Sequence, residues 1–173
     1  MIDYQTIIDR YYPEAENPKL REILLRHSRA VAEKAVGIVD AHPELQCDRD
    51  FVYAAAMLHD IGIVRCDAPG ICCYGTEPYI RHGVIGGEMI VHSAQCTVHS
   101  PVKLARVCAR HTGTGLPGLE PETWEEIIIC YADKFFSKTK PDREKTCEEA
   151  RQSLVKFGEE GVRKFDEWHR RLK

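Results

Sequence analysis

Four imidazoles and two carboxylates fall at or near the ends of predicted helices, which constrains how this chain can fold. The six residues are His27, His59, Asp60, His82, His111 and Asp133. His27 lies on the same helical stripe as Leu24 and Val31, so its imidazole is expected to face the core. Asp133 ends the apolar run of residues 127–132, where an unpaired carboxylate would be costly to bury. A fold that buries these groups has to give them polar partners.

A metal site would satisfy all six groups at once. A single histidine on an apolar face is most often a core residue whose imidazole is hydrogen-bonded. Six such groups favour a shared metal, because separate partners would each have to be buried in apolar surroundings. No strand-like alternation of apolar and polar residues stands out against the helical stripes. The sequence therefore predicts an all-α bundle with a central metal site.

The length and charge of the chain limit how many domains it is expected to form and which classes of partner it is expected to bind. Its 173 residues, 43% of them hydrophobic, predict a single domain (1–173) with a core over residues 18–140 and a C-terminal helix over 142–172. The formal net charge of −3 provides no general basic field, so a nucleic-acid polymer is not expected as a partner. No apolar run approaches the length of a membrane span, so we expect a cytoplasmic protein without a membrane partner. The eight cysteines are interpreted as reduced thiols.

Capping residues mark where the first two long helices begin. Asn17 followed by Pro18 predicts an N-cap and a first-turn proline for a helix that reaches about residue 40. Asp50 is expected to cap a helix over residues 51–59. Both of these helices carry candidate metal ligands.

Three further helices are also indicated by the sequence. Thr123 and Glu126 form a capping box ahead of the apolar run that reaches Asp133. A short helix is expected over residues 2–12, and the helix over 142–172 presents an apolar stripe that should pack on the bundle.

The segment from Arg65 to Arg81 resists a helical interpretation, because it contains two prolines and two glycines. It joins the helix that ends at His59 to the helix that begins near His82. Connections of this length in small domains are often lids or binding loops, so we expect this segment to select the substrate.

The candidate residues also occur within recognisable short motifs. These are His27 within HSRAVAEKA, His59-Asp60-Ile61-Gly62, His82-Gly83, His111-Thr112, and Asp133 within YADKF. In order and spacing, over residues 20–140, they resemble the HD-domain metal-dependent phosphohydrolases of the HDIG type. In motif style they are similar to small bacterial HD proteins that cleave diadenosine tetraphosphate. The resemblance implies a compact helical bundle with one or two divalent metals at its centre.

The resemblance also assigns the ligands. It implies that one metal is held by His27, His59, Asp60 and Asp133. By the same analogy, His82 and His111 hold a second metal, and Asp60 bridges the two.

Such a donor set suits phosphate chemistry. Imidazoles and carboxylates bind borderline first-row metals, so the expected cofactor is two divalent ions of Fe, Mn, Co, Ni or Zn. Two dications against two aspartates leave positive charge for a phosphate oxygen and an activated water. The expected function is hydrolysis of a phosphoester or phosphoanhydride in a small molecule, with a nucleotide as the favoured substrate. Arg65 and Lys138 lie a turn beyond ligands, and with Asp60 they are the predicted catalytic residues.

Two other functions use the same scaffold. Certain HD-fold proteins use a mixed-valence di-iron pair, held by the same ligand pattern, to oxygenate a C–H or C–P bond. A protein that keeps the pocket without turnover would instead be a nucleotide sensor, although the intact ligand set argues against it. The ligands do not separate oxygenase from hydrolase, because that choice depends on the metal and on the residues around it. The oligomeric state stays open.

Overall fold

Helices make up nearly all of the regular structure in the computed structural model, which describes residues 2–93, 101–113 and 117–173. The α-helices of these residues are α1 (Tyr4–Tyr11), α2 (Pro18–Ala41), α3 (Arg49–Leu58), α4 (His82–Val91), α5 (Pro101–Arg110), α6 (Trp124–Asp133), α7 (Cys147–Leu154) and α8 (Glu159–Leu172). Short 3₁₀ turns connect them: η1 (Pro43–Leu45), η2 (Ile61–Arg65), η3 (Pro69–Ile71), η4 (Tyr79–Arg81) and η5 (Val155–Phe157). The predicted all-α class is confirmed.

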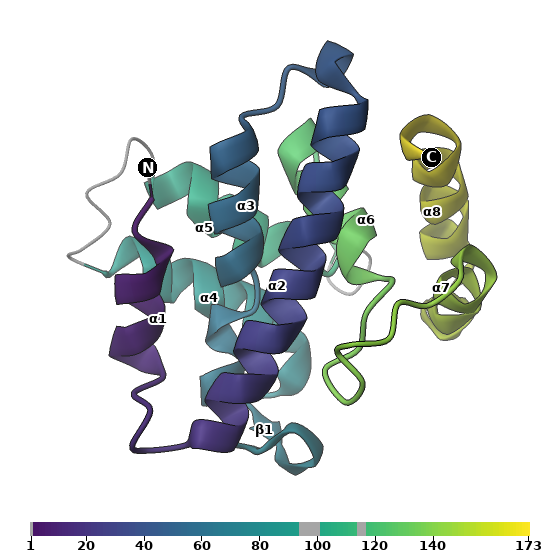
Figure 1. The fold of residues 1–173 in the computed structure, drawn as a ribbon. Coiled ribbons are helices and arrows are strands. Elements are labelled where there is room, and N and C mark those ends of the chain that lie inside the picture. The colour runs from purple at the N-terminus through teal and green to yellow at the C-terminus, as the bar shows by residue number, and fades with distance from the viewer. Residues whose placement is uncertain (1, 94–100, 114–116) are drawn as a thin grey trace.

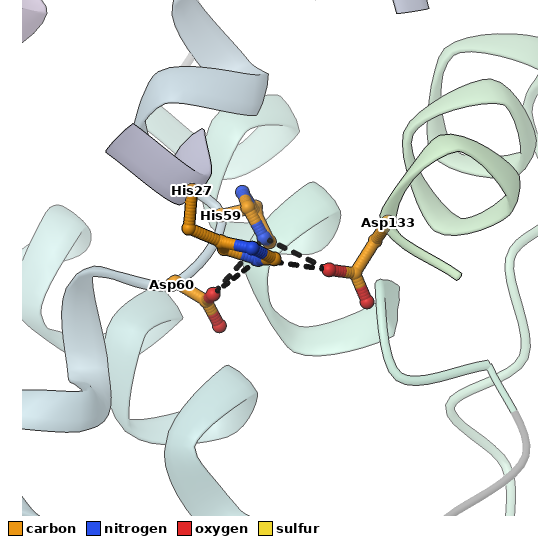
Figure 2. A group of neighbouring side chains, drawn as sticks. All are labelled: His27, His59, Asp60 and Asp133. Atoms are coloured by element: carbon orange, nitrogen blue, oxygen red, sulfur yellow. Dashed lines mark hydrogen bonds and ion pairs between the residues drawn. The ribbon is translucent and has the colours of Figure 1, made fainter. Parts of the chain in front are cut away.

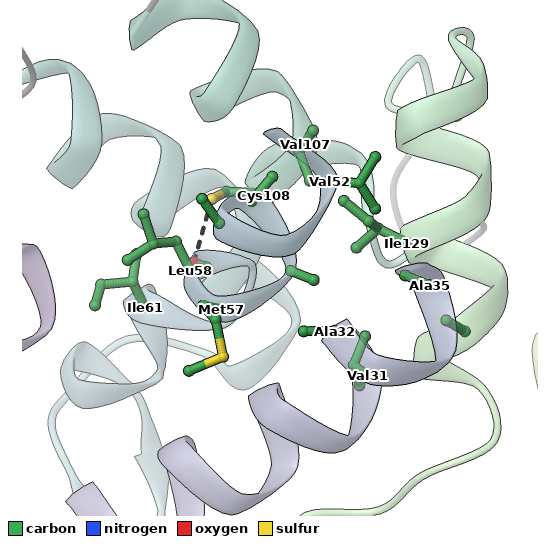
Figure 3. Close-up of a cluster of buried hydrophobic side chains, with 14 of the residues drawn as sticks. Val31, Ala32, Ala35, Val52, Met57, Leu58, Ile61, Val107, Cys108 and Ile129 are labelled. Carbon is green, nitrogen blue, oxygen red and sulfur yellow. Dashed lines mark hydrogen bonds between the residues drawn. The ribbon is translucent and has the colours of Figure 1, made fainter. Parts of the chain in front are cut away.

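The core lies where α2 and α3 pack against α5 and α6 (Figures 1 and 3). Alanines such as Ala32, Ala35 and Ala55 are fully buried there, and their small side chains let the helices approach closely. The buried Cys108 thiol of α5 donates a hydrogen bond to the Leu58 carbonyl oxygen at the end of α3, at 3.3 Å. This contact ties together the ends of two helices that precede candidate ligands.

The predicted caps of α2 and α6 are confirmed. The Asn17 side chain accepts a hydrogen bond from the Leu20 amide at 3.0 Å, and Pro18 occupies the first turn of α2. Thr123 and Glu126 form the reciprocal capping box of α6. These caps fix the starts of the helices that carry His27 and Asp133.

The predicted cap of α3 is wrong by two residues. The N-cap is Asp48, whose side chain accepts a hydrogen bond from the Phe51 amide at 3.0 Å, and Asp50 lies in the first helical turn. Both aspartates suit the positive end of a helix dipole, so composition does not choose between them.

The C-terminal segment differs from the expected single helix over 142–172. It forms α7 and α8, which are separated by η5 and by Gly158, whose φ of +104° interrupts a helix. The buried Phe165 of α8 packs against Tyr131 of α6, with ring centroids 5.3 Å apart. Figure 1 shows α7 and α8 at one side of the bundle, next to α6.

The segment over residues 65–81 is more ordered than a free loop. Its centre is a short antiparallel hairpin, in which β1 (Asp67–Ala68) pairs with β2 (Cys73–Tyr74). The Asn17 side-chain amide donates a hydrogen bond to the Cys72 carbonyl oxygen at 2.9 Å, and Cys73 is buried. The hairpin is therefore anchored at the start of α2.

In the described part of the chain, no helix combines the length and apolar character that crossing a membrane requires.

Glycines let α4 pack directly on η2 and α5. A Cβ at Gly62 would lie 2.1 Å from the His82 carbonyl oxygen, and one at Gly83 would lie 2.5 Å from the Cys108 carbonyl oxygen. Side chains at these positions would push α4 away from its neighbours. The close approach places the first residue of α4, His82, beside the end of α3.

We expect Gly62→Ala to destabilise the protein by about 1–3 kcal/mol, because backbone atoms surround the new methyl group and cannot move aside easily. The matched control is Gly37→Ala in α2, where nothing lies within 4 Å of the added Cβ. That substitution should be neutral or slightly stabilising, because alanine favours a helix. Urea unfolding of the two variants measures the difference, and equal midpoints would contradict the packing argument.

Candidate metal centre

Six separate residues from five stretches of chain converge on one buried point. His27 lies within α2, His59 and Asp60 follow α3, His82 begins α4, His111 follows α5, and Asp133 ends α6. Their ligand atoms form two groups in which all atoms lie within 4.8 Å of one another. One group contains His27, His59, Asp60 and Asp133, and the other contains Asp60, His82 and His111.

In the first group, two imidazoles face two carboxylates (Figure 2). Asp60 Oδ2 lies 3.1 Å from Nε2 of both His27 and His59. Asp133 Oδ1 lies 3.0 Å from His27 Nε2 and 3.5 Å from His59 Nε2. The four donor atoms therefore surround a common point.

The second group uses the other oxygen of Asp60. Its Oδ1 lies 3.2 Å from His82 Nε2 and 3.4 Å from His111 Nε2. The two Nε2 atoms are 2.9 Å apart. Because each carboxylate oxygen faces a different pair of histidines, Asp60 has the arrangement of a bridging ligand.

Backbone carbonyls orient three of the imidazoles. The contacts are His59 Nδ1 to Ala56 O, His82 Nδ1 to Tyr79 O, and His111 Nδ1 to Cys108 O, each 2.6 Å. A carbonyl only accepts, so Nδ1 carries the proton and, in the neutral ring, the Nε2 lone pair points into the cluster. The facing lone pairs of His82 and His111 repel each other unless a proton or a metal ion lies between them. His27 differs, because its Nδ1 is buried without a hydrogen-bond partner among the described residues.

Burial and charge make this donor set suited to a cation. Both oxygens of Asp60 and the Nε2 of His59 are buried, and their close contacts lack hydrogen-bond geometry. Burial raises the pKa of Asp60, but the charges of His59 and Lys138 outweigh it and hold the pKa well below its usual value. Burial lowers the pKa of His111 to about 4, which keeps its lone pair available. An ionised carboxylate beside a neutral imidazole fits a divalent metal.

We expect metal to bind more tightly as pH rises. Burial lowers the pKa of His59, but Asp60 and Asp133 outweigh it and raise the pKa to about 9 in the metal-free protein. The imidazole is therefore protonated at neutral pH, and a metal has to displace that proton. The apparent affinity should rise about tenfold per pH unit from roughly pH 6 to 8. Calorimetric titration with Zn²⁺ in buffers of different ionisation enthalpy measures the released proton, and a pH-independent affinity would contradict this expectation.

A cavity of about 360 Å³ opens beside the cluster and is lined by His82, His111 and Asp133. Four lysines also line it, namely Lys134, Lys138, Lys145 and Lys156. A larger cavity of about 630 Å³ lies between α2 and residues 136–144, but none of the six clustered residues lines it. Of these two cavities, the smaller is therefore the one from which a substrate can reach the cluster.

The two predicted basic residues have different positions. Lys138 Nζ lies 2.6 Å from Asp60 Oδ2, within the cluster. Arg65 is exposed at the end of η2 and does not line the cavity. The structure therefore brings Lys138 to the site and leaves Arg65 outside it.

Sequence reasoning missed residues that support or surround the cluster. The buried Tyr12 hydroxyl donates to the Ile61 carbonyl oxygen at 2.7 Å and accepts from the Val64 amide at 3.0 Å, which fixes η2 directly after Asp60. The ring of Tyr79 stacks on the imidazole of His82, with centroids 4.6 Å apart. No local pattern marks such residues, because their roles arise from packing between distant segments.

Comparison with known proteins identifies one family. The family model described as "HD domain" matches residues 24–137, a range that contains all six clustered residues. No solved structure matches at a significant level.

Two curated relatives are named tRNA (cytidine(56)-2'-O)-methyltransferase. The protein from Picrophilus torridus is 29% identical over 128 residues, which cover 67% of this chain and 32% of the relative. The protein from Thermoplasma volcanium is 28% identical over 131 residues, which cover 69% of this chain and 33% of the relative. The chain thus spans about a third of the length of the relatives that it matches.

Proposed function

The chain belongs to the HD domain family, and from that premise we propose that it is a metal-dependent phosphohydrolase. We infer that it cleaves a phosphoester or phosphoanhydride in a small molecule of the nucleotide class. The observation that carries the proposal is the division of the two Asp60 oxygens between two groups of histidines, beside a cavity lined by lysines. Two divalent ions shared by this buried carboxylate, next to the lysine ammonium groups, would be suited to holding a phosphate and activating the water that attacks it.

The proposed ligands follow the two geometric groups. His27, His59, Asp60 and Asp133 would hold one divalent first-row ion, and Asp60, His82 and His111 would hold another. When bound, the ions would supply positive charge to a phosphate oxygen and lower the pKa of the water that attacks phosphorus.

The remaining residues of the site would position the phosphate and limit access of water. Lys138 lines the cavity while contacting Asp60, so its ammonium can reach a phosphate oxygen placed beside the cluster. Lys134 is held by the His111 carbonyl oxygen at 3.1 Å and by Asp133 Oδ2 at 3.3 Å. The Tyr79 ring covers one face of His82, and it excludes water from that imidazole.

The activity named for the curated relatives is not proposed for this chain. The aligned region covers about a third of each relative, so the name of the whole protein need not describe this region. The clustered imidazoles and carboxylates support metal-assisted hydrolysis directly.

The deciding experiment is reconstitution of the metal-free protein with Mn²⁺, Fe²⁺, Co²⁺, Ni²⁺ or Zn²⁺. Metal content is measured on each preparation, together with phosphate release from nucleoside monophosphates, dinucleoside polyphosphates, cyclic nucleotides and an aryl phosphate. We expect close to two ions per chain and release of phosphate from at least one nucleotide. A fully loaded protein that releases no phosphate with any of these metals would overturn the proposal and favour an oxygenase or a nucleotide sensor.

A further inference from the structure

The four lysines of the cavity fall into two pairs. Lys138 contacts Asp60 at 2.6 Å, and Lys134 contacts Asp133 at 3.3 Å. Both of these ammonium groups are therefore balanced by carboxylates of the cluster. They belong to the inner end of the cavity.

The ammonium groups of the second pair, Lys145 and Lys156, are not paired with carboxylates of the cluster in this way. Neither ammonium makes an ion pair with a carboxylate in the part of the chain that the structure describes. Lys145 Nζ donates to the Lys134 carbonyl oxygen at 3.2 Å, and Lys156 Nζ lies 4.9 Å from the centre of the Phe157 ring. Burial lowers the pKa of Lys145, and the nearby charges of Lys134 and Lys156 lower it further against the opposing effects of Asp133 and Glu149. Positive charge is thus concentrated at the outer end of the cavity.

The walls between the two ends suit an organic group. Ile80 and Phe157 line the cavity while remaining 41% and 52% exposed, so they offer apolar surface to a bound molecule. Among the described residues that line this cavity, the only carboxylate is that of Asp133, which belongs to the cluster. An anion at the outer end therefore meets no carboxylate in the wall of the cavity, because Glu149, whose charge acts on Lys145, does not line it.

The outer wall comes from a part of the chain that the HD family model does not match. Lys145 precedes α7, and Lys156 and Phe157 belong to η5, whereas the match ends at residue 137. Figure 1 shows α7 next to α8, and α8 packs against α6, which carries Asp133. The inner end of the cavity is thus built by the matched region and by Lys138, one residue beyond it, whereas the lysines of the outer end come from the C-terminal segment.

We infer that Lys145 and Lys156 form a second anion subsite, and that the substrate carries two phosphate groups on one organic part that packs against Ile80 and Phe157. The inference rests on the proposed function, because it assumes that the first phosphate lies at the histidine and aspartate cluster. It extends that function by naming the residues that would distinguish a diphosphorylated from a monophosphorylated compound.

The test is calorimetric binding of two probes that resist hydrolysis, the 5′-phosphonate analogue of AMP and the bisphosphonate analogue of adenosine 3′,5′-bisphosphate, in which the nucleoside separates the two anionic groups. Both are titrated into the full chain reconstituted with Zn²⁺. We expect the wild type to bind the bisphosphonate more tightly. In the double variant Lys145→Gln/Lys156→Gln, affinity for the bisphosphonate should fall about tenfold, while affinity for the AMP analogue changes less than about twofold.

The control variant is Lys164→Gln, which removes a lysine of α8 that pairs with Glu160 outside the cavity. It should leave both affinities unchanged. The single variant Lys156→Gln removes an exposed side chain and keeps the test valid if the double variant unfolds. Equal affinity of the wild type for both probes, or equal losses for both probes in the variants, would overturn the subsite. Because neither probe is hydrolysed, this outcome is independent of phosphate release, which tests the proposed function.

Discussion

Asp60→Asn is expected to lower metal affinity by more than about 100-fold and to abolish turnover with it. The substituted amide would keep the shape of the side chain but lose the negative charge that both groups of histidines share. Each oxygen of Asp60 now lies between 3.1 and 3.4 Å from two imidazole nitrogens, so the loss of that charge affects both groups. Without it, two neighbouring cations would repel each other with less negative charge between them.

Metal content and phosphate release are measured on the same preparations, with Asp67→Asn as the control for loss of an exposed carboxylate. His111→Ala is the informative comparison, because His111 contacts Asp60 only through Oδ1. This substitution should weaken metal binding by the group that contains His82 and leave metal binding by the group that contains His27 unchanged. If Asp60→Asn holds more metal than His111→Ala, Asp60 does not bridge the two groups.

Much of this arrangement follows from local sequence patterns. His27 shares the stripe of Leu24 and Val31, and all three side chains are buried in α2 as that periodicity predicts. Caps and glycines also act locally, which is why the starts of α2 and α6 could be placed from a few residues. The break at Gly158 was missed, because a glycine inside a helical pattern is tolerated and shows its positive φ only in the folded chain.

The surroundings of the cluster could not be predicted in the same way. Lys145 and Lys156 line the cavity, and the segment that carries them packs on α8, which in turn packs on α6, so their placement depends on contacts between distant segments. Arg65 shows that the converse also holds. It lies five residues after Asp60, but its carbonyl oxygen accepts hydrogen bonds from the amides of Thr76 and Glu77 while its side chain faces solvent. Proximity to Asp60 in sequence therefore did not place the Arg65 side chain at the cavity.

Lys138 and Arg65 provide a matched pair of variants, because the first side chain lies in the cavity and the second lies outside it. We expect Lys138→Gln to lower kcat by about 100-fold or more, because an ammonium within the site is lost from the place where negative charge develops on phosphate. Metal content should stay close to that of the wild type, because Lys138 competes with the metal for Asp60 rather than holding it. Arg65→Gln, which changes an exposed side chain outside the cavity, should leave kcat within about twofold of the wild type.

The role of Lys138 can also be measured through thermal stability with and without metal. In the metal-free protein, Lys138→Gln leaves the buried Asp60 without its nearest cation, so we expect a lower melting temperature. Added metal restores positive charge beside Asp60 and should recover most of that loss. If the variant instead melts like the wild type without metal and also keeps its kcat, Lys138 neither neutralises Asp60 nor binds the phosphate. If kcat falls only in proportion to lost metal, its effect on turnover comes through the metal site and not through contact with substrate.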